Sequence, residues 1–212
     1  MKKIVILISG RGSNMEALIR ARDAGELPVT IAAVLSNRSD AKGLATAAAA
    51  GIATEVINHK AYPNREAFDA ALAVAIDAYA PDLVVLAGFM RILTDDFVRH
   101  FEGRLLNIHP SLLPAFPGLD THQRALDEGV RIHGCTVHFV TPALDHGPVV
   151  IQAAVPVLDG DDETALAARV LAQEHRVYPQ AVRWFAEGRL SLENGKVRLA
   201  AAQDGGRALV VP

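Results

Sequence analysis

The chain of 212 residues has one cysteine, a small net charge and, at its start, an apolar run of only a few residues. Cys135 alone rules out an internal disulfide and is typical of a reducing compartment, so we expect a cytoplasmic protein. A formal net charge of −3 leaves no basic surplus to neutralise phosphates, and we expect no nucleic-acid partner. The apolar run at 4–8 is far too short to cross a bilayer, so we expect no membrane partner.

Buried strands and amphipathic helices alternate through the first hundred residues. Apolar runs predict strands at 4–9, 30–36, 54–57 and 83–86. Helical spacing predicts helices after residue 14, at 41–50 and at 63–79. This order, with short connections, predicts an α/β fold: a doubly wound, mostly parallel sheet with helices on both faces.

The pattern changes in the second half of the chain. Polar and apolar residues alternate over 131–140, and a second strand is expected at 149–157. A long helix is expected at 163–185, followed by a hairpin that turns at Asn194-Gly195 and a frayed stretch at 203–207. The C-terminal part should therefore add antiparallel strand and one long helix to the sheet.

A glycine-rich loop, residues 9–14, stands between the first predicted strand and the first predicted helix. Glycines let a backbone approach an anion closely, and the N-terminus of a helix offers unpaired N–H groups. The loop lacks the Lys-Ser/Thr pair of a Walker loop, and Met15 replaces the third glycine of a dinucleotide fingerprint. A single phosphate monoester fits this loop, and a tight turn with a helix cap fits it equally well.

Asn107 and His109 stand two residues apart at the end of a predicted strand, so their side chains should point to the same side. Parallel sheets place their sites at such strand ends. Asp145 belongs to a second polar cluster at 144–148, where Gly147-Pro148 fixes a turn. A carboxylate near His109 would orient the imidazole and raise its pKa. Alternatively, Asp145 caps the backbone of its own turn.

The long predicted helix carries Glu174 on an otherwise apolar stripe. A buried carboxylate needs partners. The default expectation is an arginine of the same chain, and the alternative is a ligand hydroxyl. The spacing of the eight histidines matches no zinc signature, and His133 and His138 fall on opposite faces of their strand, so we expect no metal.

Four segments together resemble the folate-dependent formyltransferases. They are 9–14 (SGRGSN), 87–93 (AGFMRIL), 107–114 (NIHPSLLP) and 144–148 (LDHGP). The resemblance runs from residue 3 to about 192, and the glycine loop with Pro110 and Pro117-Gly118-Leu119 narrows it to the phosphoribosylglycinamide formyltransferases. It implies a single Rossmann-like formyltransferase domain, with a ribotide-binding half at 1–100 and a folate-binding, catalytic half at 101–200.

The resemblance also implies two substrates, glycinamide ribotide and the formyl donor 10-formyltetrahydrofolate, with no metal and a monomeric or homodimeric protein. The ribotide would contact Gly12, Ser13, Asn14, Leu171, Ala172, Gln173 and Glu174. The donor would contact Arg65, Met90, Arg91, Ile92, Leu93, Asn107, Thr141, Pro142, Ala143, Leu144 and Asp145. The phosphate would lie on the glycine loop and the ribose hydroxyls on Glu174.

The catalytic residues that the resemblance implies are Asn107, His109 and Asp145. Asn107 would stabilise the tetrahedral oxyanion, His109 would shuttle the proton, and Asp145 would orient His109. The alternatives are another formyltransferase, a formyltetrahydrofolate hydrolase and a non-catalytic phosphate or nucleotide sensor. A tRNA-directed formyltransferase would need a further nucleic-acid-binding domain, and a sensor would have no reason to keep the three residues together.

Overall fold

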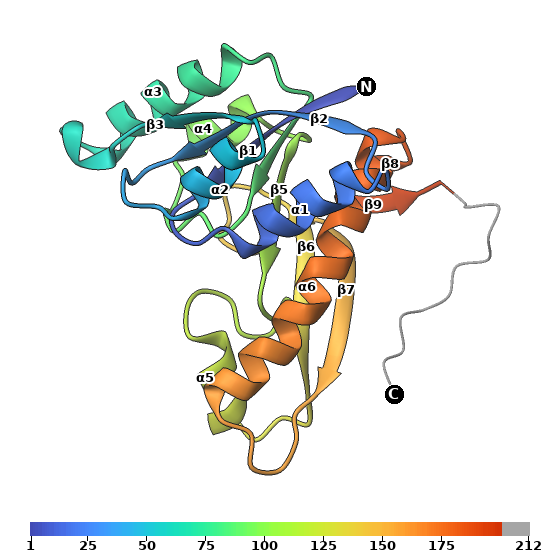
Figure 1. Cartoon of the computed structure of the whole chain (residues 1–212). Helices are drawn as coiled ribbons and strands as arrows, with labels where there is room; N and C mark the ends of the chain where they lie inside the picture. The colour runs from blue at the N-terminus through green and yellow to red at the C-terminus, as the bar shows by residue number, and fades with distance from the viewer. Residues whose placement is uncertain (201–212) are drawn as a thin grey trace.

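The computed structural model describes residues 1–200 (Figure 1), so the stretch predicted to fray at 203–207 lies outside the described residues. The strands are β1 (Lys2–Ile8), β2 (Val29–Ser36), β3 (Ala53–Val56), β4 (Leu83–Leu86), β5 (Leu105–His109), β6 (Ile132–Phe139), β7 (Val149–Pro156), β8 (Leu190–Glu193) and β9 (Lys196–Leu199). The helices are α1 (Ser13–Asp23), α2 (Gly43–Ala49), α3 (Arg65–Asp77), α4 (Asp95–His100), α5 (Thr121–Asp127) and α6 (Glu163–Ala186), with a 3-10 turn at His59–Ala61.

Seven strands form one sheet in the order β3-β2-β1-β4-β5-β6-β7, and β8 pairs with β9 separately. Strands β1 to β5 run parallel, whereas β6 is antiparallel to both of its neighbours. The strand order reverses at β1, which has β2 on one side and β4 on the other. In open α/β sheets the crevice at such a reversal, outside the carboxyl ends of the strands, is the usual place for a ligand.

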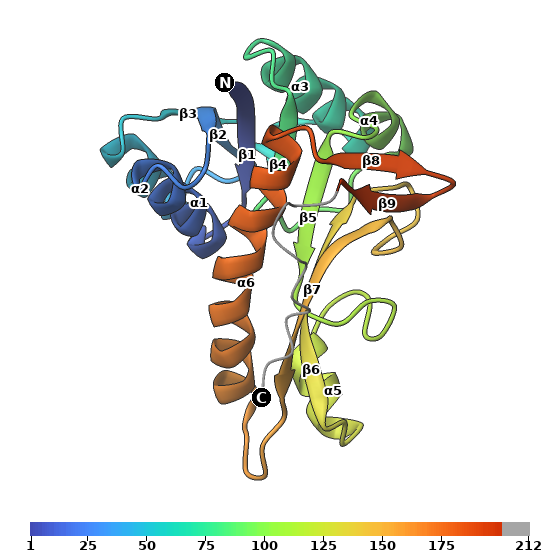
Figure 2. The same cartoon turned by 90° about the vertical axis from the view of Figure 1, so that its right-hand side faces the viewer.

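Alternate residues of β1 enter two different cores. Ile4, Ile6 and Ile8 pack in the core with α1 and α6, and Val5 and Leu7 pack in the core with α3 and α4. All five side chains are fully buried. Figures 1 and 2 show α1, α2 and α6 on one face of the sheet and α3 and α4 on the other, which confirms the predicted doubly wound fold.

The long helix α6 is fixed to the middle of the sheet. The hydroxyl of Tyr178 lies 2.8 Å from the carbonyl oxygen of Leu86 on β4 and 3.1 Å from that of Leu106 on β5. Tyr178 is fully buried, and burial raises the pKa of its hydroxyl far above the usual range, so the group stays a donor. This attachment sets the position of Glu174, which lies one turn earlier on the same helix.

Two short helices were not predicted. Thr94 caps α4 through its side chain, and α5 lies inside the stretch 111–131, which was expected to be a loop. Each contains only two apolar residues, which are adjacent, so neither sequence shows an apolar stripe at helical spacing. Within residues 1–200, none of the helices is both long and apolar enough to cross a membrane.

Candidate active site

The glycine loop connects β1 to α1 at the carboxyl edge of the sheet. Gly12 adopts φ +75°, a conformation that favours glycine, directly before the first residue of α1. Gly43 allows α2 to pack closely behind the loop: its N–H donates to the carbonyl of Gly10 at 3.0 Å, and a Cβ at Gly43 would lie 2.9 Å from the carbonyl oxygen of Arg11. The loop therefore has the geometry of an anion site at a helix N-terminus.

A pocket of about 430 Å³ opens in front of this loop. It is lined by Ser9, Gly10, Arg11, Gly12, Ser13, Asn14, Asn37, Arg38, His59, Ala87, Gly88, Met90 and Arg91. These residues come from the carboxyl ends of β1, β2 and β4 and from the segments that follow them. The pocket thus joins the glycine loop to the first residues of the segment predicted to bind the donor.

Asn107 and His109 project from the same side of β5, as predicted. Asn107 pairs in register with His138 of β6, and its Nδ2 atom lies 3.3 Å from Nε2 of that histidine. His138 Nδ1 lies 2.9 Å from the carbonyl oxygen of Phe139 and so carries the proton, which leaves Nε2 to accept from Asn107. Burial lowers the pKa of His138, which favours this neutral form.

The structure brings Asp145 to His109. The Oδ2 atom of Asp145 is 3.5 Å from Nδ1 of His109, and both side chains are less than 10% exposed, at 9% and 7%. On the other side of the ring, Nε2 of His109 lies 2.9 Å from the carbonyl oxygen of Phe116. Asp145 also accepts a 2.8 Å hydrogen bond from the N–H of Gly118. The carboxylate is thus shared between the imidazole and the loop before α5, and it does not merely cap its own turn.

The backbone around Asp145 is specialised for this placement. Asp145 itself has φ +51°, in the left-handed region that aspartate tolerates better than most residues. A Cβ at Gly147 would collide with the carbonyl oxygen of Phe139, so only glycine fits there. The N–H of Phe139 donates to the carbonyl of Pro148 at 2.9 Å and closes the loop on β6.

The default expectation for Glu174, an arginine partner, is wrong. Its Oε2 accepts a 2.6 Å hydrogen bond from Nδ2 of Asn14, and both side chains are 7% exposed. Burial raises the pKa of Glu174, and the bond from Asn14 opposes that rise. The long helix α6 is thereby joined to the first turn of α1, next to the glycine loop. Leu171, Ala172 and Gln173 precede Glu174 on α6, where none of them is fully buried.

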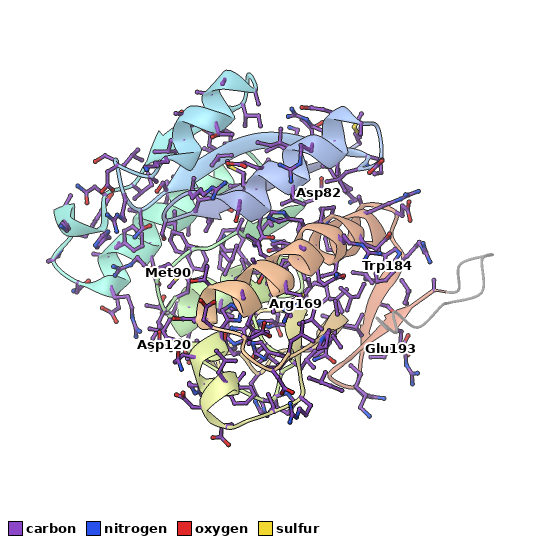
Figure 3. All side chains as sticks on the ribbon, turned by 60° about the horizontal axis from the view of Figure 1, so that its bottom comes forward. Asp82, Met90, Asp120, Arg169, Trp184 and Glu193 are labelled. Atoms are coloured by element: carbon purple, nitrogen blue, oxygen red, sulfur yellow. The ribbon has the colours of Figure 1, made fainter. Side chains whose placement is uncertain are left out.

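The residues predicted to bind the donor come from four parts of the chain: Arg65, the segment 90–93, Asn107 and the loop 141–145. Met90 and Ile92, which follow β4, are 67% and 60% exposed, and Leu144 in the loop 141–145 is 56% exposed. Figure 3 places Met90 toward the same side of the molecule as Asp120, away from Trp184 and Glu193. Arg65 begins α3 and is exposed. Arg91, between Met90 and Ile92, and Leu93, after Ile92, are partly buried. Arg91 lies over the ring of Phe68, 4.8 Å from its centroid.

Sequence reasoning missed two contacts of this site. His138 was placed on the correct face of its strand, but its pairing with Asn107 depends on the register of β5 and β6. The carbonyl of Phe116 carries no sequence signal at all. Among the described residues, no group of three or more His, Cys, Asp or Glu side chains is arranged to hold a metal ion.

Comparison with known proteins decides the family. The model of the formyl transferase family matches residues 2–182. The chain belongs to the formyl transferase family. Phosphoribosylglycinamide formyltransferase of Escherichia coli K12 is 54% identical over 96% of this chain and 94% of its own. The resemblance predicted from the four segments is therefore confirmed.

Solved structures of formyl transferases agree with the fold. A glycinamide ribonucleotide transformylase from Symbiobacterium toebii is 51% identical, with a TM-score of 0.93 over 95% of each chain. A phosphoribosylglycinamide formyltransferase from Coxiella burnetii is 49% identical, with a TM-score of 0.91 over 94% of this chain and 93% of that one. The predicted mostly parallel sheet with an antiparallel C-terminal part matches these enzymes.

Proposed function

We propose that this protein transfers a formyl group from 10-formyltetrahydrofolate to the amine of N1-(5-phospho-D-ribosyl)glycinamide in purine biosynthesis. The observation that carries the proposal is the contact between His109 and Asp145 beside Asn107, in a chain whose relatives are named for this reaction. Transfer needs an oxyanion donor and a proton shuttle within reach of one carbonyl. These three side chains supply both.

Asn107 stabilises the tetrahedral oxyanion. Its amide nitrogen carries two hydrogens, and His138 accepts only one of them. The second N–H is free to donate to the oxygen that gains charge as the amine attacks. In other acyl transfers one such donor lowers the barrier by about 3–4 kcal/mol. His138 thus fixes which end of the amide faces the substrate.

His109 takes the proton from the attacking amine and returns one to the departing folate nitrogen. Asp145 and the carbonyl of Phe116 face its two ring nitrogens. The ring nitrogen that exchanges protons with the substrate must therefore first leave its present partner, Asp145 or the carbonyl of Phe116. Because Asp145 is held in place by Gly118 and by its tight loop, Phe116 is the partner that gives way. A carbonyl oxygen only accepts, so Nε2 carries the ring proton while it faces Phe116. Once Phe116 gives way and the proton of the neutral ring lies on Nδ1 toward Asp145, Nε2 takes the proton of the amine and the imidazolium then returns it to the folate nitrogen.

The glycine loop binds the ribotide phosphate, and Glu174 binds its ribose hydroxyls. Backbone N–H groups of Gly12 and Ser13 stand at the unpaired start of α1, which suits a phosphate monoester. Nδ2 of Asn14 donates one of its two hydrogens to Glu174, so the other, together with the backbone N–H of Asn14, is left for the ligand. Leu171, Ala172 and Gln173 flank Glu174 on α6 and border the same ligand.

A spectrophotometric assay with glycinamide ribotide and 10-formyltetrahydrofolate tests the proposal. We expect deformylation of the folate that depends on the ribotide and survives a chelator. Loss of formyl groups without ribotide would indicate a formyltetrahydrofolate hydrolase instead. No deformylation in either reaction, with the wild-type protein folded, would refute an enzymatic role for these residues.

A further inference from the structure

The segment 88–94 connects β4 to α4 and contains no helix or strand. It carries Met90, Arg91, Ile92 and Leu93, the residues assigned above to the folate donor. Two of its backbone amides are bound by side chains from elsewhere in the chain. The N–H of Met90 donates to Oγ of Ser9 at 2.8 Å, and the N–H of Thr94 donates to Oδ2 of Asp69 at 2.6 Å. An irregular segment is thus attached near each of its ends.

The attachment at Ser9 is directional. The Ser9 hydroxyl donates its only hydrogen to Oδ1 of Asn37 at 2.6 Å, so toward Met90 it can only accept. Asn37 is held in turn by His59, whose Nδ1 lies 2.8 Å from the backbone carbonyl of Asn37. Ser9 and Asn37 are 6% and 3% exposed. The N–H of Ser9 also donates to the carbonyl of Gly88 at 3.0 Å, which gives a second bond between the end of β1 and this segment.

The attachment at Asp69 is a buried carboxylate. Asp69 lies on α3 and is 2% exposed, and burial raises its pKa whereas the bonds from Thr94 lower it. Its Oδ1 has no hydrogen-bond partner among residues 1–200. Burying an incompletely paired carboxylate costs stability, so the placement calls for a reason other than folding. The bond to Thr94 offers such a reason, because Thr94 is the last residue of segment 88–94 and the bond fixes where that segment ends.

We propose that Ser9 and Asp69 are positioning residues for the donor site: they hold segment 88–94 in the shape that the folate recognises. Ser9 has a second effect, because it is the residue directly before Gly10 of the glycine loop. A displacement of its hydroxyl moves both the ribotide loop and the donor segment, whereas a change at Asp69 moves the donor segment alone. This inference rests on the proposed function, since it assumes that the segment binds the formyl donor.

Direct binding measurements test the assignment. In Ser9→Ala and Asp69→Ala we expect the Kd of a non-reactive reduced-folate analogue to rise about tenfold or more. In Asp69→Ala the KM for ribotide should stay within about twofold of wild type, and in Ser9→Ala it should rise as well. The conservative variants Ser9→Thr and Asp69→Asn keep an accepting oxygen and should restore most of the folate affinity.

Two matched controls share the chemistry but not the place. Asp162 accepts the N–H of Ala165 at 2.7 Å at the start of α6, and Asp82 accepts the N–H of Lys3 at 2.8 Å. Figure 3 shows Asp82 well separated from Met90. Asp162→Ala and Asp82→Ala should lower stability without changing the Kd of the folate analogue. Equal losses of folate affinity in the controls and in the test variants would overturn the inference.

Hydrogen exchange on the wild-type protein covers the case in which a variant does not fold. The amides of Met90 and Thr94 should exchange at least tenfold more slowly than those of Ile92 and Leu93, for which residues 1–200 offer no acceptor. Rapid exchange at Met90 and Thr94 would overturn the inference. Wild-type protein that neither binds the folate analogue nor transfers formyl groups would instead refute the proposed function.

Discussion

The side-chain amide of Asn14 donates a 2.6 Å hydrogen bond to Glu174, across 160 residues of sequence. The bond joins the first turn of α1 to the middle of α6 and leaves the second carboxylate oxygen of Glu174 for a ligand. Hydrogen bonds to charged groups contribute about 1.5–3 kcal/mol, which corresponds to about 10- to 100-fold in affinity. In Glu174→Gln we therefore expect the KM for ribotide to rise by that factor and the KM for the folate to stay within about twofold. Equal increases in both KM values would contradict the assignment of Glu174 to the ribotide.

The same residue predicts a pH dependence of stability. Burial raises the pKa of Glu174 above its ordinary value of 4.5, so the charged form is disfavoured in the folded state. The contribution of Glu174 to the free energy of unfolding is therefore fully present below pH 4.5, and it is lost as pH rises through the pKa of the folded state. In urea unfolding, Glu174→Gln should therefore gain stability relative to wild type between pH 4 and pH 8. A constant difference across this range would show that Glu174 is not disfavoured as a carboxylate.

His109→Asn and Asp145→Asn should each lower kcat by about 10²- to 10⁴-fold, because proton transfer and its orientation are lost. Asparagine at 145 can still accept the N–H of Gly118, so the loop should keep its shape. Circular dichroism and steady-state kinetics check the two expectations together.

The surface pair of His100 and Asp77 provides the matched control. Its Nε2–Oδ2 distance is 2.7 Å, shorter than the contact at the site, and both side chains are more than 40% exposed, at 46% and 43%. His100→Asn should leave kcat unchanged. Wild-type turnover in His109→Asn would remove the proton shuttle from the mechanism.

The parts of this protein that were predicted from sequence are those governed by local periodicity. The run at 4–8 predicts a strand buried on both faces, and the stripe through Val170, Glu174 and Tyr178 predicts the buried side of α6; both are observed. The doubly wound sheet follows from the order of such elements. A turn conformation is also a local property: Gly12, directly before α1, adopts the positive φ that glycine allows.

The partners of the buried polar groups could not be predicted, because they depend on register and on contacts between distant segments. Asn107 meets His138 only because β5 and β6 pair in one register, and Glu174 meets Asn14 only once α6 has packed against α1. The helix α5, inside the predicted loop 111–131, was not predicted for a different reason: its only apolar residues, Ala125 and Leu126, are adjacent and form no stripe at helical spacing.

Burial of His133 should lower the free energy of unfolding in acid. His133 is 1% exposed, its Nε2 lies 3.2 Å from Nδ1 of His122, and burial together with that neighbour lowers its pKa from 6.5 to about 4. A lowered folded pKa gives stability that is present above pH 6.5 and lost as pH falls toward 4. The loss amounts to roughly 2–3 kcal/mol. In His133→Gln, the free energy of unfolding should change less over this range than in wild type.

His146, an exposed histidine, is the control for this titration. His146→Gln should keep the wild-type slope of unfolding free energy between pH 6.5 and pH 4. The comparison uses slopes and not absolute stabilities, because removing the buried ring also removes its contact with Phe116. Equal slopes in wild type and in His133→Gln would show that the proton uptake occurs elsewhere.

Cys135 should take no part in the reaction. The side chain is fully buried, and burial, with the nearby charge of Glu174, raises its pKa to about 12. Because the thiolate is the reactive form, iodoacetamide at pH 8 should label Cys135 in urea but not in the native protein. Cys135→Ala should lose about 1 kcal/mol of stability to the small cavity and keep kcat within about twofold. A large drop in kcat in a folded Cys135→Ala would indicate that the formyl group passes through a covalent intermediate on the thiol, and would contradict direct attack of the amine on the folate's formyl carbon.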